Sequence, residues 1–334
     1  MTVGLAIIGS GIMGSDHARI FAEEIPGAAV RVICDAVPAR AEALAAKLGV
    51  PAIATDPEAA IVRSDVQAVV VASPDATHAP LSLACIRMGK PVLCEKPLSS
   101  SADECLAVMR AEEAAGRRFV QIGFMRRFDQ AYADMRAALL QGRIGRALMM
   151  HNFHRNVETP AADFTGAMAI TNSAPHEFDV ARYVLETELT AVSAFQPARS
   201  DGRVAPVVMV LETGGGQLVT IEINNNAAYG YDVRGELVGE AGAVATVTPR
   251  YSVLEADLTR QAGYDADWRN RFADAYRRQN QAFLRFAATG AFPAGAASAW
   301  DGYAAAAVAR AGVRALAEGR KVDVDMIAKP EFYR

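Results

Sequence analysis

Residues 3–14 read VGLAIIGSGIMG, a short apolar run that leads directly into a glycine-rich turn. The turn has the spacing G-x-G-x-x-G at Gly9, Gly11 and Gly14, and the residues after it have helical periodicity. The first glycine permits a tight turn, the second lets a pyrophosphate approach the backbone, and the third allows close helix–strand packing. The stretch therefore predicts dinucleotide binding at a strand-to-helix junction, where the helix N-terminus attracts the anion.

The same alternation of strand and helix continues through the first third of the chain. Continuous apolar runs separated by helical patterns predict a parallel sheet that is buried on both faces. We therefore expect a doubly wound α/β Rossmann domain over residues 1–122. The further strands are expected at 29–35, 68–72, 91–94 and 119–122, and the helices at 13–23, 38–48, 76–88 and 101–115.

The pattern changes after residue 123, where strand-like runs dominate. Consecutive strands with short turns, such as the TGGGQ at 213–217, predict a second α+β domain over 123–334 with a large mixed or antiparallel sheet. The tail from 268 to 317 is helical again. The strands are expected at 147–156, 190–198, 206–213, 217–224, 232–239 and 243–249, with helices at 128–140 and 172–185.

Composition excludes several classes of function. A net charge of -4 argues against nucleic-acid or membrane-surface binding, because both need a basic face. No run approaches the ~20 apolar residues of a membrane span. The cysteines at 34, 85, 94 and 105 form no C-x-x-C pair and lack zinc-ligand spacing, so we expect reduced thiols, no metal and a cytoplasmic location.

The second strand ends in Asp35, 21 residues after Gly14. A carboxylate at this position accepts hydrogen bonds from the ribose hydroxyls of the adenosine and repels a 2′-phosphate. Ala36 follows where an arginine would favour NADP, although Arg40 lies nearby. The sequence therefore predicts NAD, with NADP the less favoured cofactor.

Glu95-Lys96-Pro97 stands at the end of the fifth apolar run, where Pro97 biases Lys96 toward an extended backbone. Here the chain resembles the glucose–fructose oxidoreductase/inositol dehydrogenase (Gfo/Idh/MocA) family, and most closely its inositol 2-dehydrogenase branch. The resemblance covers nearly the whole chain. It rests on GSGIMGSDHA at 9–18, SPDATHAP at 73–80, EKP at 95–97, GFMRRFD at 123–129, HRN at 154–156, NSAPHEFDVARYVL at 172–185, YGYDVRGELVGE at 229–240 and AWDGYAA at 299–305.

The resemblance implies NAD-dependent hydride transfer at a ring hydroxyl of a polyol such as a cyclitol, in a homodimer or homotetramer. It implies that Lys96 and His176 are the catalytic pair, with Asn172 beside them. The cofactor-binding residues it implies are Gly9, Gly11, Ile12, Met13, Asp35, Ser73, His78, Glu95 and Lys96. The substrate-binding residues are Lys96, Arg126, His154, Asn156, Asn172, His176 and Tyr231.

The residues around His176 support this role. Asn172 and His176 are i and i+4, so they share one face of a helix. We expect Asn172 or Ser173 to cap that helix and Pro175 to occupy its first turn. A positive helix end disfavours imidazolium and leaves a neutral proton acceptor. The inositol branch usually has aspartate where this chain has Asn172, and the substitution keeps hydrogen bonding but removes the charge.

On the strand at 147–156, alternate residues share a face. Asn152, His154 and Asn156 form the polar end of one face, which suits a ligand with many hydroxyls, whereas His151 points to the other face and is expected to pack. Arg126, Tyr229 and Tyr231 lie in other matched segments and could add contacts.

Two alternatives remain open. The first is a dehydrogenase of an open-chain or amino sugar. The second is an inactive, nucleotide-sensing regulatory protein on the same fold, against which the presence of both Lys96 and His176 argues.

Overall fold

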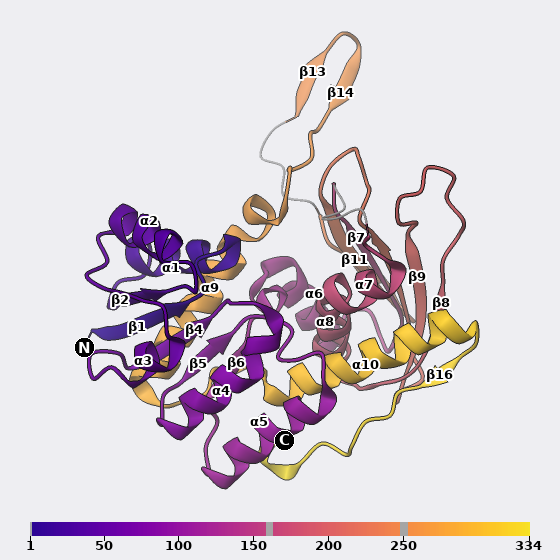
Figure 1. Ribbon diagram of the computed structural model, residues 1–334. Helices are drawn as coiled ribbons and strands as arrows, with labels where there is room; N and C mark the ends of the chain where they lie inside the picture. Colours follow the sequence, from indigo (N-terminus) through magenta and orange to yellow (C-terminus); the bar gives the residue numbers. More distant parts are fainter. Residues whose placement is uncertain (1, 158–162, 248–252) are drawn as a thin grey trace. The chain divides into compact units, whose positions relative to one another are not determined.

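The computed structural model describes residues 2–157, 163–247 and 253–334, which form two compact units (Figure 1). The first unit comprises Met1–Phe128, Asp274–Ala306 and Ile327–Arg334. The second comprises Asp129–Ala273 and Ala307–Met326. The units thus differ from the two continuous stretches expected from the sequence, because two C-terminal segments pack with the first unit.

The first unit contains a seven-stranded sheet in the order β15-β6-β5-β4-β1-β2-β3. All neighbouring pairs are parallel except β15 with β6. This is the strand order of a Rossmann fold with one antiparallel edge strand added. The strands are β1 (Val3–Ile8), β2 (Ala28–Cys34), β3 (Ile53–Ala54), β4 (Ala68–Val71), β5 (Val92–Cys94), β6 (Val120–Ile122) and β15 (Ala297–Ser298).

Helices cover both faces of this sheet, as its continuous apolar strands require. On one side α1 (Ile12–Glu23) and α2 (Pro38–Leu48) contact β2, and α9 (Trp268–Thr289) packs on α1 through Phe21 and Phe283. On the other side α4 (His78–Arg87) contacts both α3 (Pro57–Val62) and α5 (Ala102–Ala114). The carboxyl ends of β1, β2, β4 and β5 are thereby left at one edge for a ligand.

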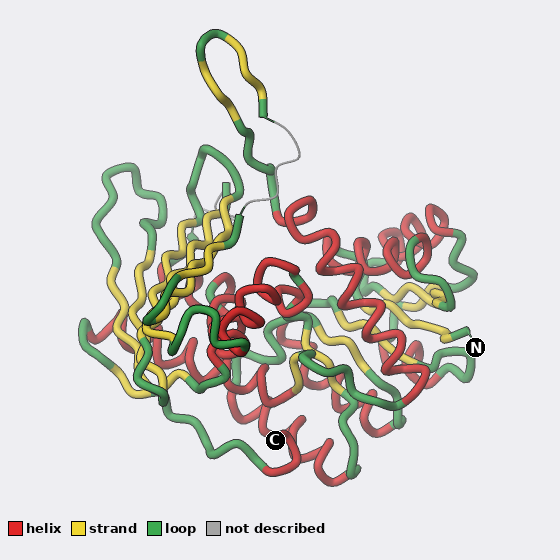
Figure 2. Tube along the Cα trace, turned by 180° about the vertical axis from the view of Figure 1, so that it is seen from behind, coloured by secondary structure: helices red, strands yellow, loops and turns green. Residues whose placement is uncertain are grey.

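The second unit contains another seven-stranded sheet, in the order β12-β11-β7-β10-β9-β8-β16. Figure 2 draws the strands of this sheet in yellow. It is a mixed sheet, because β7 and β10 are parallel and the other pairs are antiparallel. Its strands are β7 (Ala147–Arg155), β8 (Leu189–Phe195), β9 (Val207–Thr213), β10 (Leu218–Asn224), β11 (Asp232–Gly239), β12 (Ala243–Ala245) and β16 (Val322–Asp323). The strand expected at 243–249 ends at Ala245, and residues 248 and 249 lie outside the described part.

Helices α6 (Gln130–Leu140) and α8 (Pro175–Leu185) contact each other and cover one face of this sheet. Strands β7, β9 and β10 accordingly alternate buried and exposed or half-buried residues, as expected when only one face is covered. β13 (Leu254–Ala256) and β14 (Thr259–Gln261) form an exposed hairpin outside the sheet. The first residues of α10 (Ala299–Glu318), up to Ala306, belong to the first unit and the others to the second. Within the described residues, no helix combines the length and apolar character needed to cross a membrane.

Candidate active site

The glycine-rich turn has the geometry of a dinucleotide cradle. Gly9 has a positive φ of 95°, and a Cβ there would lie 2.3 Å from the Ala72 carbonyl oxygen. A Cβ at Gly14 would lie 1.8 Å from the Gly9 carbonyl oxygen, so α1 can approach β1 only with glycine there. At Gly11 a Cβ would meet nothing within 4 Å, so the space beside this backbone is open. The turn therefore fits a pyrophosphate at the first turn of α1.

Asp35 lies directly after β2 and is held by the same turn. Its Oδ2 accepts hydrogen bonds from the Ser10 amide at 2.9 Å and the Ser10 hydroxyl at 2.6 Å. Its Oδ1 accepts from the Val37 amide at 2.9 Å.

These contacts lower the pKa of Asp35. Partial burial disfavours the charged carboxylate, but the hydrogen bonds from Ser10 and Val37 have the larger combined effect. The carboxylate is thus ionised at neutral pH, and it retains lone pairs for ribose hydroxyls.

The turn after β5 places Glu95 in the interior and is held by a histidine from α1. Oε1 of Glu95 lies 2.8 Å from Nε2 of the fully buried His17, whose Nδ1 is 2.9 Å from the Asn280 amide nitrogen. Burial disfavours the charge on Glu95, but the hydrogen bond from His17 prevails and lowers the pKa of Glu95. The backbone amide of Lys96 donates to Oε2 of the same carboxylate at 3.3 Å, so Glu95 fixes the start of the lysine turn.

His17 and Asn280 were missed by sequence reasoning. His17 lies inside the motif GSDHA, but 263 residues separate it from Asn280 and 78 from Glu95. Only the packing of α9 on α1 brings the three side chains together. A histidine three residues after the last glycine of the turn was the one available signal.

Ser73 and His78 lie in the segment after β4, at the same edge of the sheet. The Ser73 hydroxyl lies 2.6 Å from the Thr77 hydroxyl. The ring of His78 is 1% exposed, with Nδ1 2.7 Å from the Pro97 carbonyl and Nε2 2.8 Å from the Ser73 carbonyl. Both ring nitrogens are therefore occupied by backbone carbonyls and are not available for the cofactor contact predicted for His78.

In the second unit, the segment before His176 corrects the expected helix start. A helical turn begins at Gly166 with Thr165 as its cap, continues as a π-helical turn over Ala169–Ser173, and then becomes α8. Asn172 lies within the π turn, and the N-cap of α8 is Ala174, with no side-chain capping bond. The expectation that Asn172 or Ser173 caps this helix is therefore wrong, because the helical chain already runs through both.

Pro175 occupies the first turn of α8, as predicted, and His176 follows it. Since helical backbone precedes α8, its first turn is not a free helix end, and the dipole argument for a neutral His176 weakens. π turns within helices occur frequently at functional sites, which is consistent with the position of Asn172.

The polar end of β7 lies beside His176. His154 donates through Nδ1 to Oε2 of the fully buried Glu177 at 3.0 Å, and its Nε2 is 3.3 Å from the Asn156 amide nitrogen. The rings of His154 and His176 have centroids 6.5 Å apart, and those of His154 and Tyr231 are 6.4 Å apart. The second unit thus gathers His154, Asn156, His176 and Tyr231, with Glu177 as a carboxylate that the sequence analysis did not assign.

Other candidate residues have different surroundings. His151 points to the opposite face of β7, as expected, where its Nδ1 lies 2.7 Å from the Thr220 hydroxyl. Tyr229 binds Arg155 and Asp232 through its hydroxyl, and Arg155 is also on the His151 face. Arg126 is buried in a 3₁₀ turn over Met125–Phe128 of the first unit. Lys96 belongs to the same unit.

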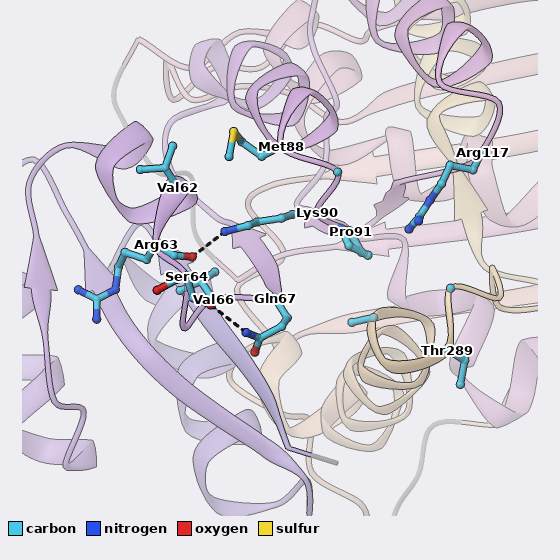
Figure 3. Close-up of a pocket in the computed structure, with 13 residues that line it drawn as sticks. Val62, Arg63, Ser64, Val66, Gln67, Met88, Lys90, Pro91, Arg117 and Thr289 are labelled. Atoms are coloured by element: carbon cyan, nitrogen blue, oxygen red, sulfur yellow. Dashed lines mark hydrogen bonds between the residues drawn. The ribbon is translucent and has the colours of Figure 1, made fainter.

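A hollow of about 590 Å³ in the first unit lies at the other edge of the Rossmann sheet (Figure 3). It is lined by segments that precede β4, β5 and β6, including Gln67, Lys90 and Arg117. The Lys90 ammonium donates hydrogen bonds to the carbonyls of Ile61 and Arg63 near the end of α3. Its positive charge therefore has a structural role at a helix C-terminus. Because dinucleotides bind at the carboxyl ends of the strands, this hollow is not the nucleotide site. In the described part of the chain, no group of three or more His, Cys, Asp or Glu side chains could hold a metal ion.

The fold and the glycine-rich turn define a nicotinamide-dinucleotide-dependent oxidoreductase. The model of the oxidoreductase family with an NAD-binding Rossmann fold matches residues 3–124, and that of the GFO/IDH/MocA C-terminal domain matches residues 132–245. The chain therefore belongs to the Gfo/Idh/MocA family, and the resemblance seen in its motifs is confirmed.

Full-length relatives agree with this assignment. The chain is 46% identical to inositol 2-dehydrogenase 1 of Saccharopolyspora erythraea, with 100% of this chain and 99% of that protein covered. It is 40% identical to inositol 2-dehydrogenase of Streptomyces avermitilis, covering 99% and 97%. The structure of myo-inositol dehydrogenase from Lactobacillus casei in complex with NAD(H) and myo-inositol has a TM-score of 0.94 at 29% identity, with both chains fully covered.

Proposed function

We propose that this chain is an NAD-dependent dehydrogenase that oxidises a ring secondary alcohol of an inositol-type cyclitol. The observation that carries the proposal is full-length similarity to inositol 2-dehydrogenases, at 46% identity for one of them. The site chemistry supports it. The first unit holds a dinucleotide cradle and a lysine at its edge, and the second holds histidines and amides suited to a polyol.

The reaction converts a carbinol into a ketone. When held by the glycine-rich turn and Asp35, NAD would supply the acceptor for the hydride of the carbinol carbon. The hydroxyl proton must leave for the C=O bond to form. We assign the proton to His176, because an imidazole can accept it at neutral pH. The ammonium of Lys96 polarises the reacting oxygen, which carries negative charge as the proton departs.

His154 and Asn156 bind and orient the substrate. Because Glu177 accepts the Nδ1 proton of His154, Nε2 is left as the acceptor side of the ring. Asn156 offers both a donor and an acceptor at that end of β7. Together they can recognise neighbouring hydroxyls on a ring, and Tyr231 borders the same histidine.

The preference for NAD follows from the ionised Asp35. We also propose a homo-oligomer that uses the open sheet face of the second unit. This proposal is supported by Phe195, Val208 and Leu218, which are 58%, 40% and 39% exposed, because apolar patches on a monomer are usually small. The four cysteines are buried with free thiols, which suits a reducing cytoplasm.

A panel of inositol isomers, hexoses and amino sugars with NAD tests the function, read by the absorbance of NADH. We expect turnover of at least one inositol at a higher kcat/KM than any open-chain or amino sugar. Lys96→Ala should abolish most of that turnover, whereas Lys47→Ala on the exposed part of α2 should not change it. NAD binding without turnover of any polyol would instead support the nucleotide-sensing alternative.

A further inference from the structure

His78 binds two backbone carbonyls from two different turns. It is the first residue of α4, and its ring reaches the carbonyl of Ser73 after β4 and the carbonyl of Pro97 after β5. Both distances, 2.8 and 2.7 Å, are those of true hydrogen bonds. The ring therefore ties together the two turns at the carboxyl edge of the sheet.

The two contacts determine the protonation state of the ring. A carbonyl oxygen can only accept a hydrogen bond, so each ring nitrogen facing one must carry a proton. A neutral imidazole has one N–H and one lone pair, and either tautomer would place that lone pair against a carbonyl oxygen. Only imidazolium donates to both.

The surroundings can stabilise a buried charge. Cys94 acts on the ring, and the charge of His78 is in turn one of the influences that lower the pKa of the neighbouring Glu95. Burial works against the charge on His78, but the Cys94 side chain and the two carbonyls outweigh it and raise the pKa of His78 to about 10. The ring sits at the start of α4, where the helix dipole also opposes it, so these favourable contacts are necessary.

We propose that His78 is a buried imidazolium that clamps the Ser73 and Pro97 turns together and thereby positions Lys96 for the reaction. Lys96 lies between two residues that are each held by a histidine, since His17 binds the Glu95 carboxylate and His78 binds the Pro97 carbonyl. His78 is thus a positioning residue that acts through backbone. The kinetic part of this inference rests on the proposed function, whereas the charge of His78 does not.

Nitrogen-15 NMR of histidine-labelled protein tests the charge directly. The chain has five histidines, and His78→Gln identifies the resonances of His78 by their loss. At about pH 8, where an ordinary histidine with a pKa of ~6.5 is neutral, we expect both ring nitrogens of His78 to be protonated. A neutral tautomer at that pH would overturn the proposal, whatever substrate the enzyme uses.

Kinetics test the positioning. His78→Phe keeps a ring but loses both donors, and we expect kcat to fall by up to ~10²-fold, as for a catalytic group displaced by about 1 Å. The dissociation constant for NAD and the KM should change little, and His78→Gln, which keeps one donor group, should recover part of the kcat. His151→Gln, on the opposite face of β7, is the matched control and should behave as wild type. Wild-type kcat in folded His78→Phe or, if that variant does not fold, in His78→Gln would refute the positioning role.

Discussion

Replacing Asp35 by asparagine removes one charge from the end of β2 while keeping the shape of the side chain. The remaining amide oxygen can still accept from the Ser10 amide, which donates to Oδ2 at 2.9 Å in the wild type. The variant therefore isolates the charge from the architecture of the turn. Asp35→Ser, which removes the acceptor as well, separates the two contributions further.

The magnitude follows from Coulomb's law. Two like unit charges ~4 Å apart repel by ~1 kcal/mol in water and by ~4 kcal/mol at an effective dielectric of ~20. At ~1.4 kcal/mol per factor of ten, Asp35→Asn should narrow the preference for NAD over NADP by between ~5-fold and ~10³-fold. Because the pKa of Asp35 is lowered, the charge persists in mild acid, so the wild-type preference should hold from about pH 8 to about pH 5.

The assay is kcat/KM for each cofactor at saturating polyol, for wild type, Asp35→Asn and Asp65→Asn. Asp65 pairs with Arg63 at the other edge of the sheet, so its variant should keep the wild-type ratio. Either a wild type that prefers NADP or an unchanged ratio in Asp35→Asn would refute the assignment of Asp35 as the cofactor-selecting residue.

Three further outcomes follow from the site and the packing. Lys96→Ala and His176→Ala should each lower kcat by ~10²–10⁴-fold, with the dissociation constant for NAD little changed in His176→Ala; near-normal turnover in stopped-flow assays would remove that residue from the mechanism. Tyr333→Phe removes the hydrogen bond from the Tyr333 hydroxyl to the buried Glu112 at 2.5 Å, so urea unfolding should show a loss of ~1–3 kcal/mol with kcat unchanged. Sedimentation should show an oligomer at micromolar concentration that Val208→Lys weakens, and a monomeric wild type would contradict this use of the open sheet face.

Local signals predicted the first unit well because each of its elements carries its own pattern. The helix at 38–48 has the predicted bounds, since Pro38 starts it and Gly49, at a φ of 66°, ends it. The two-residue strands β3, β15 and β16 were not predicted, because periodicity cannot appear in so few residues. Their pairing, and the return of the C-terminal segments to the first unit, depend on contacts between parts distant in sequence.

The candidate site was predictable where one motif contains the chemistry, as in the glycine-rich turn. Contacts between residues that are distant in sequence could not be predicted. Examples are the contact of His17 with Glu95 and that of His154 with Glu177, which form only in the folded chain. The π turn was also missed, because one additional residue in a helical turn leaves no periodic signature. Thr165, which caps the helical run, was the usable signal for its true start.

The π turn sharpens the test of Asn172. If Asn172 capped α8, aspartate would cap it equally well, and the choice between the two residues would say nothing about catalysis. The N-cap of α8 is Ala174, however, so this explanation does not apply. Asn172 instead precedes His176 within one helical segment, and its Oδ1 accepts from the Thr171 hydroxyl at 3.1 Å.

A carboxylate near an imidazole favours the protonated ring, so Asn172→Asp should move the acid limb of kcat/KM to higher pH by up to ~1 unit if the groups lie within ~4–6 Å. It also loses the amide donor, so the ranking of inositol isomers should change. Asn270→Asp, which adds the same charge at an exposed position of α9, should alter neither property. An unchanged pH profile together with an unchanged ranking in Asn172→Asp would show that asparagine at this position does not set the specificity of the site.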